Sequence, residues 1–241
     1  MKLLIVRHAD PDYTIDSLTP AGWKEAELLS ERLSRLDVKA FYVSPLGRAK
    51  DTASLTLKKM GREATECEWL KEFPPRISRP DKETETIAWD WLPADWTKEE
   101  RYYDKNAWDT TAPMSAGHVG EEYHRVIAEF DRLLASHGYD REGAYYRASH
   151  ANSDTIILFC HFGLECVLLS HLLGISPMVL WHGTCAAPSS VTTLTSEERR
   201  EGIAAFRMNS FGDVSHLYVA GEQPSFAARF CETFDSAERH D

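Results

Sequence analysis

The chain has 241 residues, a length that suits one α/β domain with an elaboration or two small domains. Hydrophobic residues make up 43% and charged residues 27%, as in a soluble globular protein with a sizeable core. The net charge of −11 argues against a general surface for nucleic acid or for anionic membranes. A phosphorylated substrate stays compatible with this charge if a few arginines gather in one pocket.

The cysteines and the apolar runs indicate a compartment. The cysteines at positions 67, 160, 166, 185 and 231 form no Cys-x-x-Cys pair, and their number is odd. This usage is typical of reduced, intracellular proteins. No stretch approaches the roughly 18 apolar residues of a membrane span, and the N-terminal run is too short for the core of a signal peptide. We expect a cytoplasmic protein that neither spans nor binds a membrane.

The chain begins with a strand that ends in two basic side chains. The apolar run from Leu3 to Val6 predicts a strand buried on both faces, and the pair Arg7-His8 follows it directly. After a polar loop, Thr19 as N-cap and Pro20 at the first helical position predict a helix with one apolar stripe.

A second strand and helix repeat this arrangement. Residues 40–43 predict a strand, and Ser44 as N-cap with Pro45 at the first helical position predict a helix that Gly61 ends. Arg48 then lies in the first turn, where the orphan amides and the helix dipole favour anions.

From Pro74 to about His118 the composition changes. A third short strand is expected over 65–70, before this segment. The segment itself contains four of the seven tryptophans and shows no period of 2 or 3.6 residues. We interpret it as an inserted cap of short helices whose aromatic residues either stabilise it or line a substrate site.

The second half of the chain again pairs strands with helices. The expected elements are a helix over 120–137, a hairpin within 139–153, a buried strand over 155–160, a helix over 164–173, and strands over 191–195 and 203–208. The buried strand ends in a histidine, His161. This alternation predicts a single α/β domain, a three-layer α/β/α sandwich with a mostly parallel sheet and the inserted aromatic-rich cap at about 74–118.

Three strand ends therefore bring basic side chains to the carboxyl edge of one sheet, where ligands of α/β proteins bind. Neutral imidazole can accept a phosphoryl group, and guanidinium groups can clamp its oxygens. A second histidine can hold the oxygen on which charge builds, and a carboxylic acid must protonate the departing alkoxide. Walker, GxGxxG, HExxH and GxSxG motifs are absent, so we expect neither a metal nor a cofactor.

The ordered motifs resemble the histidine phosphatase superfamily, in its phosphoglycerate mutase-like branch. The resemblance is carried by Leu-Ile-Val-Arg7-His8-Ala9, by Ser44-Pro45-Leu46-Gly47-Arg48-Ala49-Lys50-Asp51-Thr52-Ala53 and by Phe159-Cys160-His161-Phe162-Gly163, with weaker matches at 18–22 and 211–217. It implies that His8 is the phosphorylated nucleophile. It also implies that Arg7, Arg48 and His161 are the other members of the phosphate pocket.

The resemblance further implies a glutamate as general acid, soon after the third strand in a Leu-x-Glu context. Leu70-Lys71-Glu72 matches, although Phe73 and its successors replace the usual glycine-rich continuation. Glu66, Glu68 or a carboxylate of the cap remain alternatives. Phe162 stands where the acid-phosphatase branch has an aspartate, which excludes that placement.

Several positions match no pattern. Tyr13, Thr14 and Asp16 occupy the region where the family often has an extra polar phosphate ligand. Glu121 resembles a second recurrent glutamate or is simply a charge at a helix start. We expect His150 and His182 to be structural.

The sequence thus predicts a metal-independent phosphomonoesterase that acts on a small phosphorylated metabolite through a phosphohistidine at His8. Two alternatives stay open: a phosphoglycerate mutase-type transfer, and a catalytically weak module that binds a phosphorylated ligand. The oligomeric state is also open.

Overall fold

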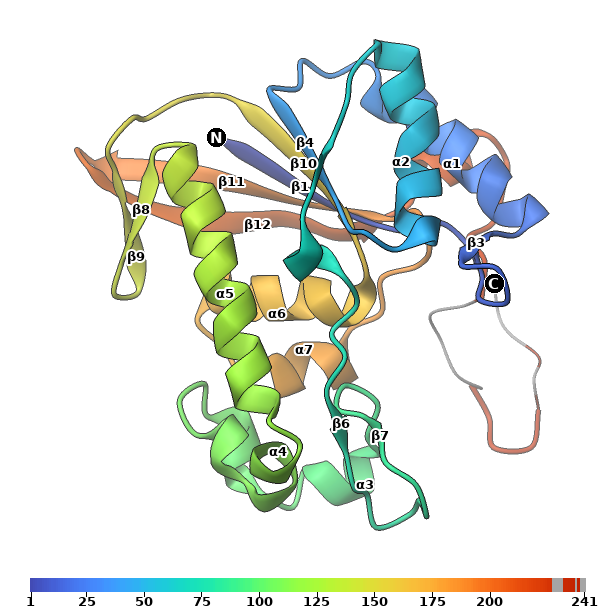
Figure 1. The fold of residues 1–241 in the computed structure, drawn as a ribbon, viewed down its shortest axis with the longest axis vertical. Helices are drawn as coiled ribbons and strands as arrows, with labels where there is room; N and C mark the ends of the chain where they lie inside the picture. Colours follow the sequence, from blue (N-terminus) through green and yellow to red (C-terminus); the bar gives the residue numbers. More distant parts are fainter. Residues whose placement is uncertain (227–231, 237, 239–241) are drawn as a thin grey trace.

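The computed structural model describes residues 1–226, 232–236 and 238, and Figure 1 shows their fold. Part of the predicted polar tail and Cys231 lie outside these residues. The main sheet contains β1 (Lys2–Arg7), β4 (Ala40–Val43), β5 (Thr65–Glu66), β8 (Tyr139–Glu142), β9 (Tyr145–Ala148), β10 (Thr155–Cys160), β11 (Val191–Arg200) and β12 (Ile203–Asp213). Their order is β5-β4-β10-β1-β11-β12-β9-β8.

The sheet has a parallel half and an antiparallel half. Strands β5, β4, β10 and β1 run parallel, whereas β1 with β11, and then β12, β9 and β8, pair antiparallel. Parallel neighbours need crossover connections, which helices supply here, while tight turns join β8 to β9 and β11 to β12. The predicted α/β fold around a helix-flanked central sheet is confirmed.

Helices cover both faces of this sheet (Figure 1). Helices α1 (Pro20–Leu33) and α2 (Gly47–Met60) lie on one face, and α5 (Val119–Ser136), α6 (Phe162–Leu173) and α7 (Pro177–Gly183) lie on the other. A short helix, α8 (Ser215–Val219), packs against α1. Alternate side chains of β1 serve the two layers, because Leu3 and Ile5 join the core under α5 and α6 while Leu4 and Val6 join the core under α1 and α2.

Helix α1 begins where the sequence predicts, but α2 does not. The Thr19 hydroxyl accepts a hydrogen bond from the Gly22 amide at 3.0 Å, as an N-cap should. Helix α2 begins at Gly47 with Leu46 as N-cap, so the prediction of Ser44 as N-cap and Pro45 as first helical residue is wrong. The Ser44 amide continues the ladder to Phe159 O at 2.9 Å, which keeps the chain extended through this residue.

The third strand is also shorter than predicted. Strand β5 covers only Thr65–Glu66, and a 3₁₀ turn, η1 (Glu68–Leu70), replaces the rest. Both β5 residues are exposed at the sheet edge, whereas Trp69 and Leu70 are buried. The turn is therefore needed to bring the two apolar side chains into the core.

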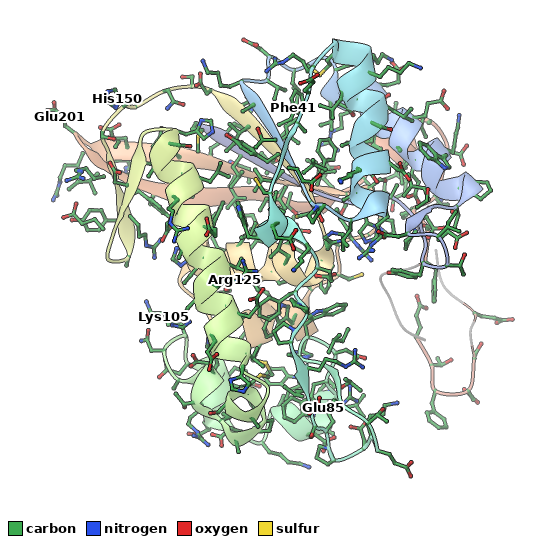
Figure 2. All side chains as sticks on the ribbon, in the orientation of Figure 1. Phe41, Glu85, Lys105, Arg125, His150 and Glu201 are labelled. Atoms are coloured by element: carbon green, nitrogen blue, oxygen red, sulfur yellow. The ribbon has the colours of Figure 1, made fainter. Side chains whose placement is uncertain are left out.

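The cap lies at the lower end of Figure 1, where Figure 2 labels Glu85. It consists of β6 (Arg76–Ile77), β7 (Thr86–Ile87), α3 (Pro93–Trp96), η2 (Glu100–Tyr103), η3 (Trp108–Thr110) and α4 (Ala112–Ala116). Trp91, Trp96 and Trp108 are buried, and the Trp108 ring centroid lies 5.7 Å from that of Trp181 in α7. Most aromatic residues of the cap therefore hold it against the body.

Within the part of the chain that the structure describes, none of the helices has the length and apolar character that crossing a bilayer requires.

Candidate active site

His8 follows β1 directly and is buried in the centre of the carboxyl edge. Its Nδ1 lies 2.8 Å from the carbonyl oxygen of Ala9. A carbonyl only accepts hydrogen bonds, so Nδ1 carries the proton and Nε2 carries the lone pair. Burial lowers the pKa of His8 well below its usual value, and the Arg7 guanidinium lowers it further. His8 is thus a neutral imidazole with a free nucleophilic nitrogen.

His161 follows the neighbouring parallel strand β10 and faces His8. The two ring centroids are 5.1 Å apart, and the His8 amide donates to Cys160 O at 3.0 Å. His161 Nε2 lies 2.7 Å from the Ser44 hydroxyl, while its buried Nδ1 has no hydrogen-bond partner among the described residues. Burial lowers the pKa of His161 well below its usual value, and His8 and the arginines add to the effect. A buried polar atom without a partner indicates a place for a ligand atom.

Arg48 lies in the first turn of α2, with 11% of its side chain exposed. Its Nη1 donates to Asp16 Oδ1 at 2.6 Å, and the Gly47 amide donates to Asp16 Oδ2 at 2.7 Å. Arg48 Nε is buried and has no hydrogen-bond partner in the described ranges. Asp16 thus orients the guanidinium while one donor stays available for an anion.

Asp16 belongs to a loop that the sequence did not identify as functional. It precedes β3 (Ser17–Leu18), which pairs with β2 (Pro11–Asp12), and its backbone adopts a left-handed φ of 48°. The one available signal was that Tyr13, Thr14 and Asp16 occupy the region where the family often has an extra polar phosphate ligand. The structure places a carboxylate there that contacts Arg48.

Arg7 contacts Ala186, in the loop before β11, and Phe162, at the start of α6. Its Nη1 donates to Ala186 O at 2.6 Å, and its Cζ lies 5.9 Å from the centroid of the Phe162 ring. Arg7 also lies close enough to His8, His161 and Glu72 to shift the pKa of each. The residues predicted from the strand ends therefore come together.

Glu72 lies beside the start of α6, the helix that directly follows His161. Its Oε1 accepts hydrogen bonds from the Phe73 amide at 2.8 Å and the Leu164 amide at 3.0 Å, and its Oε2 accepts from the Gly163 amide at 3.4 Å. Burial raises the pKa of Glu72, although these amides and Arg7 oppose the shift. A carboxyl with a raised pKa that contacts the helix start directly following His161 and lies near Arg7 suits a general acid.

The alternative glutamates lie in other surroundings. Glu66 pairs with Lys50 and Glu68 pairs with Lys71, and each of the two carboxylates is more than half exposed. Their side chains therefore serve surface ion pairs, and Glu72 remains the candidate that contacts the site.

Glu165 is a second acidic residue at the site, and sequence reasoning missed it. It is buried on α6, and neither carboxylate oxygen has a hydrogen-bond partner of good geometry in the described chain. Burial raises the pKa of Glu165 to about 7, with the Thr192 hydroxyl and Arg7 opposing and Glu72 adding to the shift. A glutamate within an otherwise apolar helix was the available signal.

Three other residues lie elsewhere. Glu121 is exposed at the start of α5, where it accepts a hydrogen bond from His118 at 2.8 Å. His182 bridges Met178 O and the amide of Trp91, which is a structural role, and His150 is exposed. Figure 2 shows His150 on the opposite end of the molecule from the cap.

The arrangement can bind a tetrahedral anion. Guanidinium groups come from β1 and α2, and both lie close enough to the neutral imidazole of His8 to lower its pKa, with a second imidazole facing it. The site retains unpaired buried donor positions at Arg48 Nε and His161 Nδ1, counted over the described residues. Two fixed positive charges and these donors match the oxygens of a phosphoryl group.

This chain resembles known phosphatases in part of its sequence and in its fold. The phosphatase Pgam5 of Caenorhabditis elegans, described as a mitochondrial serine/threonine-protein phosphatase, is 32% identical over 99 residues. This match covers 39% of the present chain and only 33% of Pgam5, so the chain spans about a third of the relative that it matches.

Solved structures share the fold at low identity. A mutant of phosphoserine phosphatase from Entamoeba histolytica, in complex with phosphoserine, gives a TM-score of 0.58 at 21% identity, over 90% of this chain and 98% of that chain. Mycobacterial glucosyl-3-phosphoglycerate phosphatase gives 0.56 at 21% identity, over 88% and 98%. Alpha-ribazole phosphatase from Shigella flexneri gives 0.53 at 18% identity, over 89% and 97%.

The family model of the histidine phosphatase superfamily, branch 1, matches residues 3–209, which include all five predicted site residues. The match runs through nearly the whole α/β body and the cap. The predicted assignment to a family of phosphatases is confirmed, and the chain belongs to the histidine phosphatase superfamily.

Proposed function

We propose that this chain is a metal-independent phosphomonoesterase that acts through a phosphohistidine at His8. The observation that carries the proposal is the state of His8, a buried neutral imidazole whose Nδ1 proton is held by Ala9 O. Its Nε2 is therefore available to attack phosphorus. Arg7, Arg48 and His161 surround it with positive charge and donor atoms.

The reaction proceeds in two phosphoryl transfers. His8 Nε2 forms a bond to phosphorus while the bond from phosphorus to the ester oxygen breaks, and Glu72 gives its proton to that oxygen. Water then attacks the phosphohistidine, Glu72 takes the water proton, and the N–P bond breaks to return neutral His8 and release phosphate. Arg7, Arg48 and His161 hold the three non-bridging oxygens in both steps.

The substrate that we propose is a small phosphorylated metabolite. The neighbours in structure carry names of this kind, such as phosphoserine phosphatase and glucosyl-3-phosphoglycerate phosphatase. At such low identity the likeness shows the fold alone. Release of phosphate from a panel of phosphorylated metabolites is therefore the measurement that identifies the ester. We place the enzyme in the cytoplasm, free of nucleic-acid and membrane partners, and fractionation of cells checks that location.

Trapping the intermediate tests the mechanism. Acid quench of the enzyme after mixing with radiolabelled phenyl phosphate should leave label on the protein, and His8→Ala should lose both the label and at least about 10³-fold of the hydrolysis rate. His150→Ala is the matched control, because this exposed histidine lies away from the site.

Two results would contradict the proposal. Unimpaired hydrolysis by His8→Ala would remove the nucleophile. Binding of phosphate esters without trapped label or turnover would instead favour the module that only binds a phosphorylated ligand. Mutase activity would be detected as transfer between the hydroxyls of phosphoglycerate in the presence of the bisphosphate.

A further inference from the structure

Two aromatic rings stand beside Arg7 and Glu72 and have no part in the proposed mechanism. Phe162 is the first residue of α6, and its ring centroid lies 5.9 Å from Arg7 Cζ. Trp89, from the cap, packs edge to face on Phe162 with 6.2 Å between the ring centroids. The cap and the body thus meet in one aromatic pair at the site, which we call the Trp89–Phe162 pair.

Trp89 also touches the surroundings of the general acid. Its Nε1 donates to Phe73 O at 3.0 Å. A Cβ placed on Gly163 would lie 2.6 Å from Trp89 Nε1 and 2.8 Å from Glu72 Oε1. Because Gly163 has no side chain, the indole and the carboxylate can both lie against the start of α6.

The Trp89–Phe162 pair is more exposed than four aromatic residues of the cap, and a fifth, Tyr103, is 52% exposed and packs on Trp96. Trp91, Trp96, Tyr102 and Trp108 are buried and stabilise the cap, whereas Trp89 and Phe162 are only partly buried. Part of each of these two side chains is accessible from outside. The rings are therefore able to contact a ligand as well as each other.

The proposed reaction determines which part of a substrate comes near these rings. Phosphorus lies between His8 and the two arginines, and the ester oxygen must lie within reach of the Glu72 carboxyl to receive its proton. The atoms attached to that oxygen then lie next to Glu72, and hence next to the Trp89–Phe162 pair. A flat π-system packs on such rings by offset stacking or edge to face.

We propose that the Trp89–Phe162 pair selects phosphate esters whose leaving group presents a flat aromatic face. This inference rests on the proposed function, because it assumes that phosphate binds beside His8. The substrate class is monoesters that carry an aryl or heteroaryl group, and two residues outside the catalytic machinery select them.

Binding of unreactive phosphonates tests selection separately from catalysis. Benzylphosphonate replaces the ester oxygen of phenyl phosphate with CH₂, and methylphosphonate has the same anionic group without the ring. Calorimetric titration should give wild-type enzyme about a tenfold preference for benzylphosphonate. Phe162→Leu and Trp89→Leu keep an apolar side chain without the aromatic face. Each should weaken benzylphosphonate binding by about 3- to 10-fold. Trp89→Leu should leave methylphosphonate binding unchanged, whereas Phe162→Leu, whose ring contacts Arg7, should weaken methylphosphonate binding less than benzylphosphonate binding.

Controls separate the possible results. Tyr145→Leu, at a 37% exposed tyrosine on β9, should leave both dissociation constants unchanged. Tyr13→Leu removes an exposed aromatic ring on the Arg48 side of the site, 5.4 Å from Arg48 Cζ and 66% exposed. Retained methylphosphonate binding also shows that a variant is folded.

Three outcomes would overturn the inference. Equal affinity of wild-type enzyme for the two phosphonates would remove the preference, and loss of the preference only in Tyr13→Leu would assign it to the other side of the site. A failure of both phosphonates to bind would overturn the phosphate site itself, and with it the proposed function. That last result differs from the others because methylphosphonate binding is lost as well.

Discussion

The two ends of the candidate site are built differently: we call the end where we propose that phosphate binds the phosphate end, and the end where we propose that the ester's departing group lies the leaving-group end. At the phosphate end, Arg7, His8 and His161 directly end or follow adjacent parallel strands, and Arg48 begins the helix after a third. At the leaving-group end, Glu72 follows a short 3₁₀ turn, and Trp89 comes from the cap. Hydrogen bonds to the start of α6 are what hold Glu72 in place.

Because the two ends are built differently, a fold of this kind can keep one chemistry while its substrate changes. The strand register places the phosphate end, since the pairing of Arg7 with Cys160 also sets the distance between His8 and His161. The leaving-group end depends on packing between the cap and α6, which a few side chains can alter. Substitutions at the two ends should therefore have different effects on catalysis, binding and stability.

The largest effect is expected for Glu72→Gln at the leaving-group end. A glutamine cannot donate an acidic proton, so hydrolysis of an alkyl phosphate should fall by about 10³-fold. The kcat/KM for para-nitrophenyl phosphate reports the first transfer alone and should fall only about tenfold, because nitrophenolate departs without protonation. Steady-state kinetics on the two esters provide the measurement.

The pH profile gives a second readout of the same variant. Since burial raises the pKa of Glu72, wild-type activity on the alkyl ester should decline as pH rises through that pKa, and this decline should be missing in Glu72→Gln. Glu68→Gln, which changes an exposed surface pair, is the control. An equal loss of kcat/KM on both esters would assign Glu72 to the phosphate end instead, whereas an equal loss of kcat alone would reflect its second role as the base for water.

The next effect concerns Glu165, which lies close enough to Arg7 and Glu72 for both to shift its pKa. Its pKa of about 7 exceeds the reference value of 4.5, so the folded protein binds this proton more tightly than the unfolded chain does. The stability associated with the neutral carboxyl is full below about pH 4.5 and is lost as pH rises through about 7. Glu165→Gln removes this loss and should exceed wild type by about 3 kcal/mol in unfolding free energy at about pH 8.

Denaturant unfolding of wild type and Glu165→Gln at several pH values measures this difference. The advantage of the variant should vanish toward about pH 4.5. Glu66→Gln, at an exposed carboxylate, should show no such trend. If Glu165→Gln were less stable than wild type throughout, the ionised carboxylate would instead be a stabilising partner of Arg7.

A smaller effect is expected for Asp16→Ala at the phosphate end. Loss of the carboxylate frees the Arg48 guanidinium, so kcat should fall by about tenfold. KM should not rise, because removal of the negative charge strengthens the attraction of phosphate to Arg48. Asp12→Ala is the control, since that carboxylate contacts Thr14 in the exposed loop. A higher KM with unchanged kcat would show that Asp16 acts only on binding.

The smallest effect is expected for Ser44→Ala. The Leu46 amide contacts the Ser44 oxygen at 3.3 Å, which leaves the hydroxyl proton for His161 Nε2. His161 then carries its own proton on Nδ1, and loss of this control should lower kcat by about 3- to 5-fold. Nitrogen NMR of the His161 ring reports the tautomer in both proteins. An unchanged ring signal in Ser44→Ala would exclude this role.

Local sequence signals were enough to predict the α/β architecture and the basic residues proposed to bind phosphate. Strong apolar runs predicted β1 and β10, and the parallel pairing that follows from helical crossovers brings their ends together. Arg7, His8 and His161 end or directly follow predicted strands, and Arg48 lies in the first turn of a predicted helix. These local signals selected the four residues, and the family resemblance implied their roles.

Other features of the site became visible only in the folded chain. The tertiary structure moved the start of α2 to Gly47, shortened β5, and brought Asp16 to Arg48 from a loop without a pattern. Glu165 also became part of the site only through burial. Such contacts join side chains far apart in the chain, and they depend on packing and desolvation, which periodicity does not encode.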